Sequence, residues 1–248
     1  MKYMMSSSRS SGHGYPRGGL HGQIVHAIGR QILSGQIPPG ELLPAEAELP
    51  VSRTVLREAI KVLAAKGLVE SRPKTGTRVR ARSAWNLLDP DVLAWQQDGA
   101  SPVAFLGKLT EVRLIVEPAT AELAARRASP TELQTIEEAF RGMEAAVAGS
   151  DEDHTAFDQA DMRFHRAIVR TCGNDLLEQM ASVVFSALGV SFRATSRVPG
   201  RAKASLPEHR AILNAIQRRH PRRAGQAMGR LVQHTAREIE RLSEHEHA

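Results

Sequence analysis

Residues 20–82 contain a characteristic order of elements, in which three helical segments precede two short strands. Apolar residues recur with helical spacing in the first and third segments, and Gly35 and Gly67 follow these segments as helix-ending residues. Pro44, with acidic residues after it, suits the first turn of a shorter second helix, and residues 73–76 form a turn between two β-rich stretches. The helices are expected over 20–34, 44–49 and 53–66, and the strands over 68–72 and 77–80. This order predicts a winged helix-turn-helix domain.

The third helix of this domain has one apolar and one basic face. Leu56 and Leu63 belong to the apolar face, while Arg53, Arg57 and Lys61 recur every four residues on the other. Such a row of cations can reach phosphates and guanine edges, although an ordinary solvated basic face has the same pattern. The adjoining hairpin adds four more cations, Arg72, Lys74, Arg78 and Arg80. Their proximity favours contact with nucleic acid.

The charge of the chain is divided unevenly along its length. Residues 1–82 carry 13 Lys and Arg against 5 Asp and Glu, a net charge of +8, whereas residues 83–248 carry 20 against 22, a net charge of −2. This division suggests a polyanion-binding module joined to a separate partner module. The sequence has no run of about 18 apolar residues, so no membrane helix is expected. The single cysteine, Cys172, excludes an internal disulfide and is consistent with a cytoplasmic location.

The chain after the hairpin has helical patterns and no alternating strand pattern. It is therefore expected to form an all-α bundle of six or seven helices, which makes the whole protein mainly α. The expected divisions are a disordered tail over 1–19, the winged helix-turn-helix over 20–82, a linker with a short helix over 83–100, and the helical domain over 101–246.

Three side chains of the helical domain form a candidate metal site. Asp161 and His165 are one turn apart on the same helical face, and His209 flanks an apolar stripe on another helix. A buried carboxylate and imidazole can be a simple ion pair, but one carboxylate with two histidines also suits Zn, Ni, Mn or Fe(II). Five other histidines are expected in tails or on exposed faces without a role: His13, His21, His26, His245 and His247.

The first domain resembles the DNA-binding domain of GntR-superfamily transcription regulators. The resemblance covers about residues 22–82 and rests on Gly35–Gly40, Leu43–Glu46, Val51–Ala59, Gly67–Val69 and Gly76–Val79. It implies that Arg53, Thr54 and Arg57 contact the operator and that the wing tip at Gly76 enters the minor groove. A homodimer would then read a palindromic site in double-stranded DNA.

The second domain is similar to the FCD ligand-binding domain of the FadR branch of that superfamily. The resemblance covers about residues 88–244 and rests on Leu114–Ala119, Ala121–Ala125, Asp161–His165 and Glu208–Ile212. It implies a divalent metal held by Asp161, His165 and His209. Family members with four ligands have a further histidine at the position of Leu231, and His234 lies one turn beyond it at the edge of the apolar stripe. A surface position is the favoured interpretation of His234.

The same resemblance indicates a small carboxylate effector. Arg113 lies where sugar-acid-responsive relatives pair an arginine with the effector carboxylate, and Arg193 is a second candidate. The alternative for Arg113 is a helix ion pair with Glu117, one turn on. The segment 85–95 resembles regulators of hexonate and hexuronate catabolism, so a sugar acid is the expected effector class.

One departure from the family pattern leaves the function open. Relatives carry a longer segment between the positions of Leu49 and Val51, whereas this chain has only Pro50, so the second helix must be shortened. A degenerate regulator with impaired DNA binding is therefore an alternative to a working one. A second alternative is a metalloenzyme that uses the two histidines and one carboxylate. No nucleophile, base or cofactor loop accompanies that set, so the chain is not expected to be an enzyme.

Overall fold

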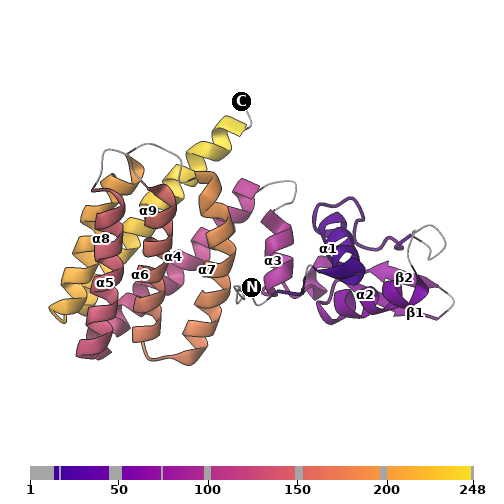
Figure 1. Cartoon of the computed structure of the whole chain (residues 1–248), viewed down its shortest axis with the longest axis horizontal. Helices are drawn as coiled ribbons and strands as arrows, with labels where there is room; N and C mark the ends of the chain where they lie inside the picture. The colour runs from indigo at the N-terminus through magenta and orange to yellow at the C-terminus, as the bar shows by residue number, and fades with distance from the viewer. Residues whose placement is uncertain are drawn as a thin grey trace, which may run out of the picture. The chain divides into compact units, whose positions relative to one another are not determined.

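The protein is described by a computed structural model that covers residues 14–16, 18–44, 52–73, 75–97, 102–148, 153–195 and 200–246 (Figure 1). The chain divides into two compact units, residues 1–95 and residues 96–248. The helix expected over 44–49 lies, apart from Pro44, outside the described residues.

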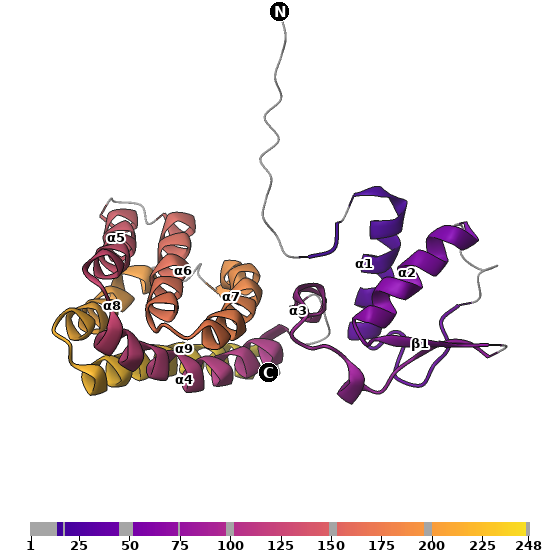
Figure 2. The same ribbon diagram turned by 90° about the horizontal axis from the view of Figure 1, so that it is seen from below.

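The described part of the first unit consists of two long helices, a hairpin and a short helix. Its elements are α1 (Gly19–Leu33), α2 (Arg53–Ala65), β1 (Val69–Arg72), β2 (Gly76–Val79), a 3-10 turn (Arg82–Ala84) and most of α3 (Pro90–Gln97). Helices α1 and α2 pack side by side, and strand β1 of the hairpin contacts α2 (Figure 2). The strands are antiparallel, with Val69 opposite Val79 and Arg72 opposite Gly76. The predicted winged helix with its hairpin is confirmed.

Local sequence explains how α2 begins and ends. The Ser52 side chain accepts a hydrogen bond from Val55 N at 3.3 Å, which satisfies one of the free amides of the first turn. Gly67 follows the helix with φ +76, and a Cβ there would lie 2.3 Å from the carbonyl oxygen of Ala84. Only glycine therefore allows the tight connection from α2 to the hairpin. On the inner face, Leu56, Ala59 and Leu63 are buried.

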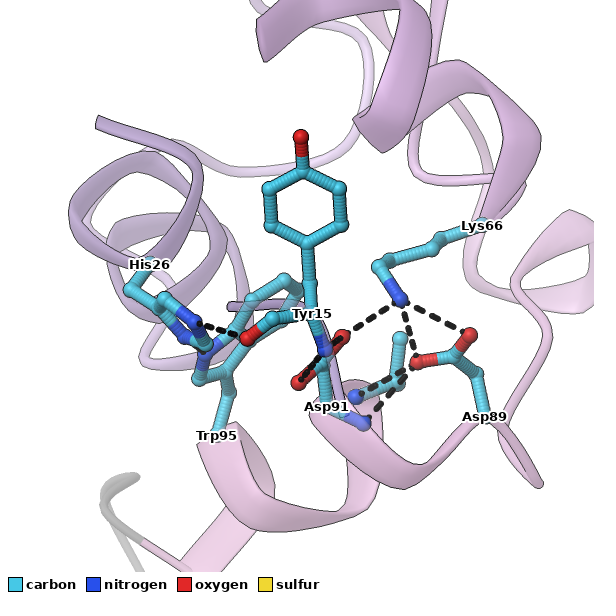
Figure 3. A network of polar contacts seen from close by, with 7 residues as sticks. Tyr15, His26, Lys66, Asp89, Asp91 and Trp95 are labelled. Carbon is cyan, nitrogen blue, oxygen red and sulfur yellow. Dashed lines mark hydrogen bonds and ion pairs between the residues drawn. The ribbon is translucent and has the colours of Figure 1, made fainter. Parts of the chain in front are cut away.

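A set of buried polar contacts ties α3 to the rest of the first unit, and we call it the α3 clasp (Figure 3). It consists of Tyr15, His26, Lys66, Asp89, Asp91 and Trp95. Lys66 Nζ lies 2.8 Å from Asp89 Oδ1 and 2.6 Å from Asp91 Oδ2, and the Trp95 indole donates to His26 Nδ1 at 2.9 Å. The backbone amide of Tyr15 donates to the Asp91 carboxylate at 2.9 Å.

The α3 clasp corrects two expectations. His26 was expected on an exposed face, but it is buried beneath Trp95, and its Nε2 lies 3.2 Å from the carbonyl oxygen of Tyr15. Gly29, one turn after His26, makes this approach possible because a Cβ there would lie 2.5 Å from the Trp95 ring. A disordered tail was expected through residue 19, yet Tyr15 packs against the core of this unit and α1 begins at Gly19. Residues 1–13 lie outside the described part of the chain.

The described part of the second unit is a bundle of helices. Its members are α4 (Pro102–Arg127), α5 (Pro130–Ala146), α6 (His154–Thr171), α7 (Asp175–Thr195), α8 (Arg201–Gln217) and α9 (Pro221–Glu246). Helices α4 and α9 pack along each other, and α6 contacts α4, α5 and α7 (Figures 1 and 2). Ser129 and Glu132 form a capping box at the start of α5, and the Asp153 side chain caps α6. The prediction of an all-α second domain is confirmed.

None of the described helices combines the length and the apolar character that a membrane span requires.

Candidate functional site

The structure brings Asp161, His165 and His209 together in the second unit. The first two lie on α6 and the third on α8. Asp161 Oδ1 lies 2.9 Å from His209 Nε2 and 3.7 Å from His165 Nε2. One ligand atom from each side chain lies within 4.8 Å of the others. The helical spacing of Asp161 and His165 therefore gives a convergent set, with the third member supplied by another helix.

The Nδ1 atom of each histidine, on the side of the ring away from Asp161, has an oxygen close to it. His165 Nδ1 lies 2.6 Å from Glu117 Oε2, and His209 Nδ1 lies 2.9 Å from the carbonyl oxygen of Ser205. With a metal bound, a proton on Nδ1 alone would suit both partners and leave both Nε2 lone pairs free for the ion beside Asp161. This arrangement orients imidazoles as metal ligands commonly are.

A metal ion fits this donor set. His209 Nε2 is fully buried and makes no regular hydrogen bond among the described residues, although Asp161 Oδ1 is close to it. A buried nitrogen without a well-aligned partner is costly, and an ion bound between the two side chains would supply one. Two imidazoles and one carboxylate suit Zn, Ni, Mn or Fe(II). Asp161, His165 and His209 would hold the ion.

The charges of the site favour a buried cation. Burial raises the pKa of Asp161, but His165 and His209 more than offset this and hold it well below its ordinary value. Burial lowers the pKa of His165, but Glu117 and Asp161 more than offset this and raise it to about 9. With no metal bound, the His165 imidazole is therefore protonated on both nitrogens and positively charged at neutral pH. The two carboxylates favour positive charge at this position.

Arg113 and Glu117 lie beside this set on α4. Both are buried, and Arg113 Nε donates a short hydrogen bond to Glu117 Oε1. Burial raises the pKa of Glu117, but Arg113 and His165 more than offset this and lower it to about 2. The ion pair with Glu117, given above as the alternative for Arg113, is thus present. Glu117 also contacts His165 on α6, a contact between two helices that the spacing of residues along the chain does not indicate.

A small pocket opens beside the three candidate ligands. Arg113 lines it together with Arg201 from α8 and with Leu231 and Thr235 from α9. Leu231 therefore faces the same pocket as the three candidate ligands. His234 is exposed, and its Nδ1 lies 2.6 Å from Glu208 Oε1. The side chain of Arg193 lies outside the described residues.

The predicted DNA-contacting residues lie on the first unit. Arg53, Thr54 and Arg57 are exposed on the first turns of α2. Gly76 is exposed at the start of β2, beside the hairpin turn. The exposed positions of these residues leave them accessible to a nucleic acid.

These features define a winged-helix protein whose second domain is an all-α bundle with a polar pocket. Residues 20–79 match the family "Bacterial regulatory proteins, gntR family", and residues 108–234 match the FCD domain. The galactonate operon transcriptional repressor of Escherichia coli (strain K12) is 34% identical over 226 residues, which cover 89% of this chain and 97% of that protein. The uncharacterized HTH-type transcriptional regulator YieP of the same strain is 30% identical over 197 residues, 78% of this chain and 84% of that protein.

A solved structure supports the fold alone. The structure of Lar, which controls the expression of the Listeria monocytogenes agr system, matches with a TM-score of 0.62 at 17% identity, over 92% of this chain and 100% of that one. The matches together show that the chain belongs to the GntR family of bacterial regulatory proteins, in the group that carries an FCD domain. It is a transcription regulator.

Proposed function

We propose that this regulator binds a sugar acid beside a divalent metal in its second unit, and that this binding controls its affinity for a palindromic operator. The observation that carries the proposal is the convergence of Asp161, His165 and His209 in a pocket that Arg113 also lines. The similarity to a galactonate operon repressor supports a sugar acid as effector and repression as the mode of regulation.

Each part of the site has a distinct role in this proposal. Asp161, His165 and His209 hold the metal, which supplies open coordination positions for an oxygen ligand. Arg113 binds the effector carboxylate, because a guanidinium can donate two parallel hydrogen bonds to it. Leu231 contributes no ligand atom, so more of the coordination sphere is open than in relatives with a fourth protein ligand. Arg193 is retained as a second candidate for the effector carboxylate.

The first unit supplies the DNA contacts. Arg53, Thr54 and Arg57 contact the operator from α2, and the wing at Gly76 enters the minor groove. The protein acts as a cytoplasmic homodimer, so that two such units read the two halves of the operator. A gel-shift with duplexes selected from a random library separates this function from a degenerate regulator that has lost DNA binding.

The metal and effector roles are tested on the purified full chain. Elemental analysis should find one divalent metal per protomer, and calorimetry should show that D-galactonate or D-gluconate binds more weakly after chelation. His209→Ala should lose the metal and the effector response while DNA binding without effector persists. His234→Ala is the matched control, because it removes an exposed histidine outside the pocket. Undiminished sugar-acid binding to the chelated protein would refute the metal's role and leave the three side chains as an ion-pair cluster.

A further inference from the structure

Glu117 contacts both proposed ligand-binding groups of the second unit. Its Oε1 accepts a short hydrogen bond from Arg113 Nε, and its Oε2 lies 2.6 Å from His165 Nδ1. Arg113 Nη2 also lies 3.5 Å from Oε2. One carboxylate therefore joins the arginine assigned to the effector with a histidine assigned to the metal.

The three side chains are almost fully buried. The exposed fractions are 4% for the Arg113 side chain and 2% each for Glu117 and His165. In so dry an environment, charged hydrogen bonds are strong and each bond depends on the others made by the same group. A change in what Arg113 binds should therefore change the strength of the interaction between Glu117 and His165.

We propose that Glu117 is the positioning residue that couples effector binding at Arg113 to metal binding at His165. This inference rests on the proposed function of the pocket. An effector carboxylate that pairs with Arg113 draws the guanidinium partly away from Glu117. The freed charge of Glu117 then acts more strongly on the Nδ1 proton of His165. A histidine whose Nδ1 proton interacts with a carboxylate donates electrons more strongly to a metal through Nε2. The effector therefore raises the affinity for the metal.

The coupling through Glu117 differs from direct contact between effector and metal. Direct contact needs no Glu117, whereas the route through Arg113, Glu117 and His165 is interrupted when the carboxylate loses its charge. Thermodynamic linkage requires that metal tighten the effector by the same factor as effector tightens the metal. Removing the charge of Glu117 should therefore reduce both effects together.

The test compares Glu117→Gln with Glu111→Gln in the full chain. Glu111 lies on the same helix but is exposed, so its variant makes the same change of charge outside the pocket. Calorimetry measures the affinity for Zn²⁺ with and without D-galactonate, and for D-galactonate with and without Zn²⁺; D-gluconate and acetate serve as further carboxylate probes. Nuclear magnetic resonance of the zinc-bound protein follows the Nδ1 proton of His165.

The expected outcome is specific to Glu117. Glu117→Gln should weaken Zn²⁺ about 10- to 100-fold, as is typical when a partner behind a ligand is removed, and should shift the His165 Nδ1 proton. The factor by which carboxylate and zinc strengthen each other should fall toward 1, while Glu111→Gln behaves as wild type. Glu117→Asp, which keeps the charge and shortens its reach, provides a second variant if Glu117→Gln does not fold.

Three other outcomes are distinguishable from one another. If wild type binds both ligands cooperatively and Glu117→Gln keeps the full coupling factor, the inference is wrong and the proposed function stands. If wild type binds the two ligands independently, the inference is wrong and the metal's role in the proposed function is refuted with it. If wild type binds neither zinc nor any of the carboxylates, the proposed function fails and the inference fails with it.

Discussion

Lys66 and Asp91 form a buried ion pair in which Nζ and Oδ2 lie 2.6 Å apart. Lys66 is the residue that ends α2, the helix that carries the predicted DNA contacts, whereas Asp91 lies in the first turn of α3. The pair therefore fixes the end of α2 to α3 within the first unit. The Trp95 contact with His26 fastens α3 to α1 in the same way (Figure 3).

Lys66→Met should destabilise the first unit by about 3 kcal/mol. The substitution leaves the carboxylates of Asp89 and Asp91 without their cation, and removing one partner of a buried pair costs about 3–5 kcal/mol. The lower end is expected because the backbone amide of Tyr15 still binds Asp91. Urea unfolding followed by tryptophan fluorescence measures this, since both tryptophans of the chain, Trp85 and Trp95, lie in this unit.

The control for this prediction is Lys61→Met. Lys61 pairs with Glu58 at 2.7 Å, but their side chains are 71% and 52% exposed, so the loss should be below about 1 kcal/mol. Equal destabilisation by the two variants would contradict a structural role for the buried pair.

The contribution of Lys66 should depend on pH at the alkaline end. Burial lowers the pKa of Lys66, but Asp89 and Asp91 more than offset this and hold it above its ordinary value of 10.5. A raised pKa in the folded state means that the stabilisation is fully present below pH 10.5 and is lost as the pH rises through the folded-state pKa. The difference in unfolding free energy between wild type and Lys66→Met should stay constant from about pH 7 to 10 and shrink above that range. A difference that grows with pH would have the wrong sign for this explanation.

Local signals in the sequence predicted the features of α2 and the hairpin. Gly67 indicated the end of the helix, and residues 73–76 favoured a turn. The spacing of Asp161 and His165 likewise placed both on one face of α6, and His209 joined them as expected from the resemblance. These features depend on a few neighbouring residues or on a known pattern.

Contacts between distant segments could not be predicted in the same way. His26 and Trp95 are 69 residues apart, and nothing in the spacing around either residue indicates the other. The contact of Glu117 with His165 depends on how α4 packs against α6, which helical periodicity does not specify. The only local signal that His26 faces the core is its position directly after the apolar residue Val25.

Arg57→Ala should weaken operator binding by about 1–3 kcal/mol, the value of a good bidentate contact to a base pair. The fold should persist, because the Arg57 side chain is exposed. Binding to a selected duplex and to a scrambled one should be titrated at one fixed salt concentration. Arg237→Ala, which removes an exposed arginine of α9, is the matched control. Unchanged affinity in Arg57→Ala would show that Arg57 does not contact the operator.

Leu231→His should raise the affinity for zinc at least about tenfold, equivalent to about 1.4 kcal/mol. Leu231 is buried, and it lines the pocket that contains Asp161, His165 and His209. An imidazole there can supply a fourth protein ligand and complete the tetrahedral set that zinc prefers. The same change should weaken D-galactonate in the presence of zinc, because the fourth ligand occupies a coordination position that the carboxylate would use.

Calorimetry with Zn²⁺ and D-galactonate on wild type, Leu231→His and Leu231→Ala tests this prediction. The alanine variant enlarges the pocket without adding a ligand, so it separates the effect of a new donor from that of lost packing. Tighter zinc together with weaker sugar acid in the histidine variant alone is the expected result. If zinc binds equally to all three proteins, the side chain at this position does not reach the metal, and the open coordination position must be explained by another part of the pocket.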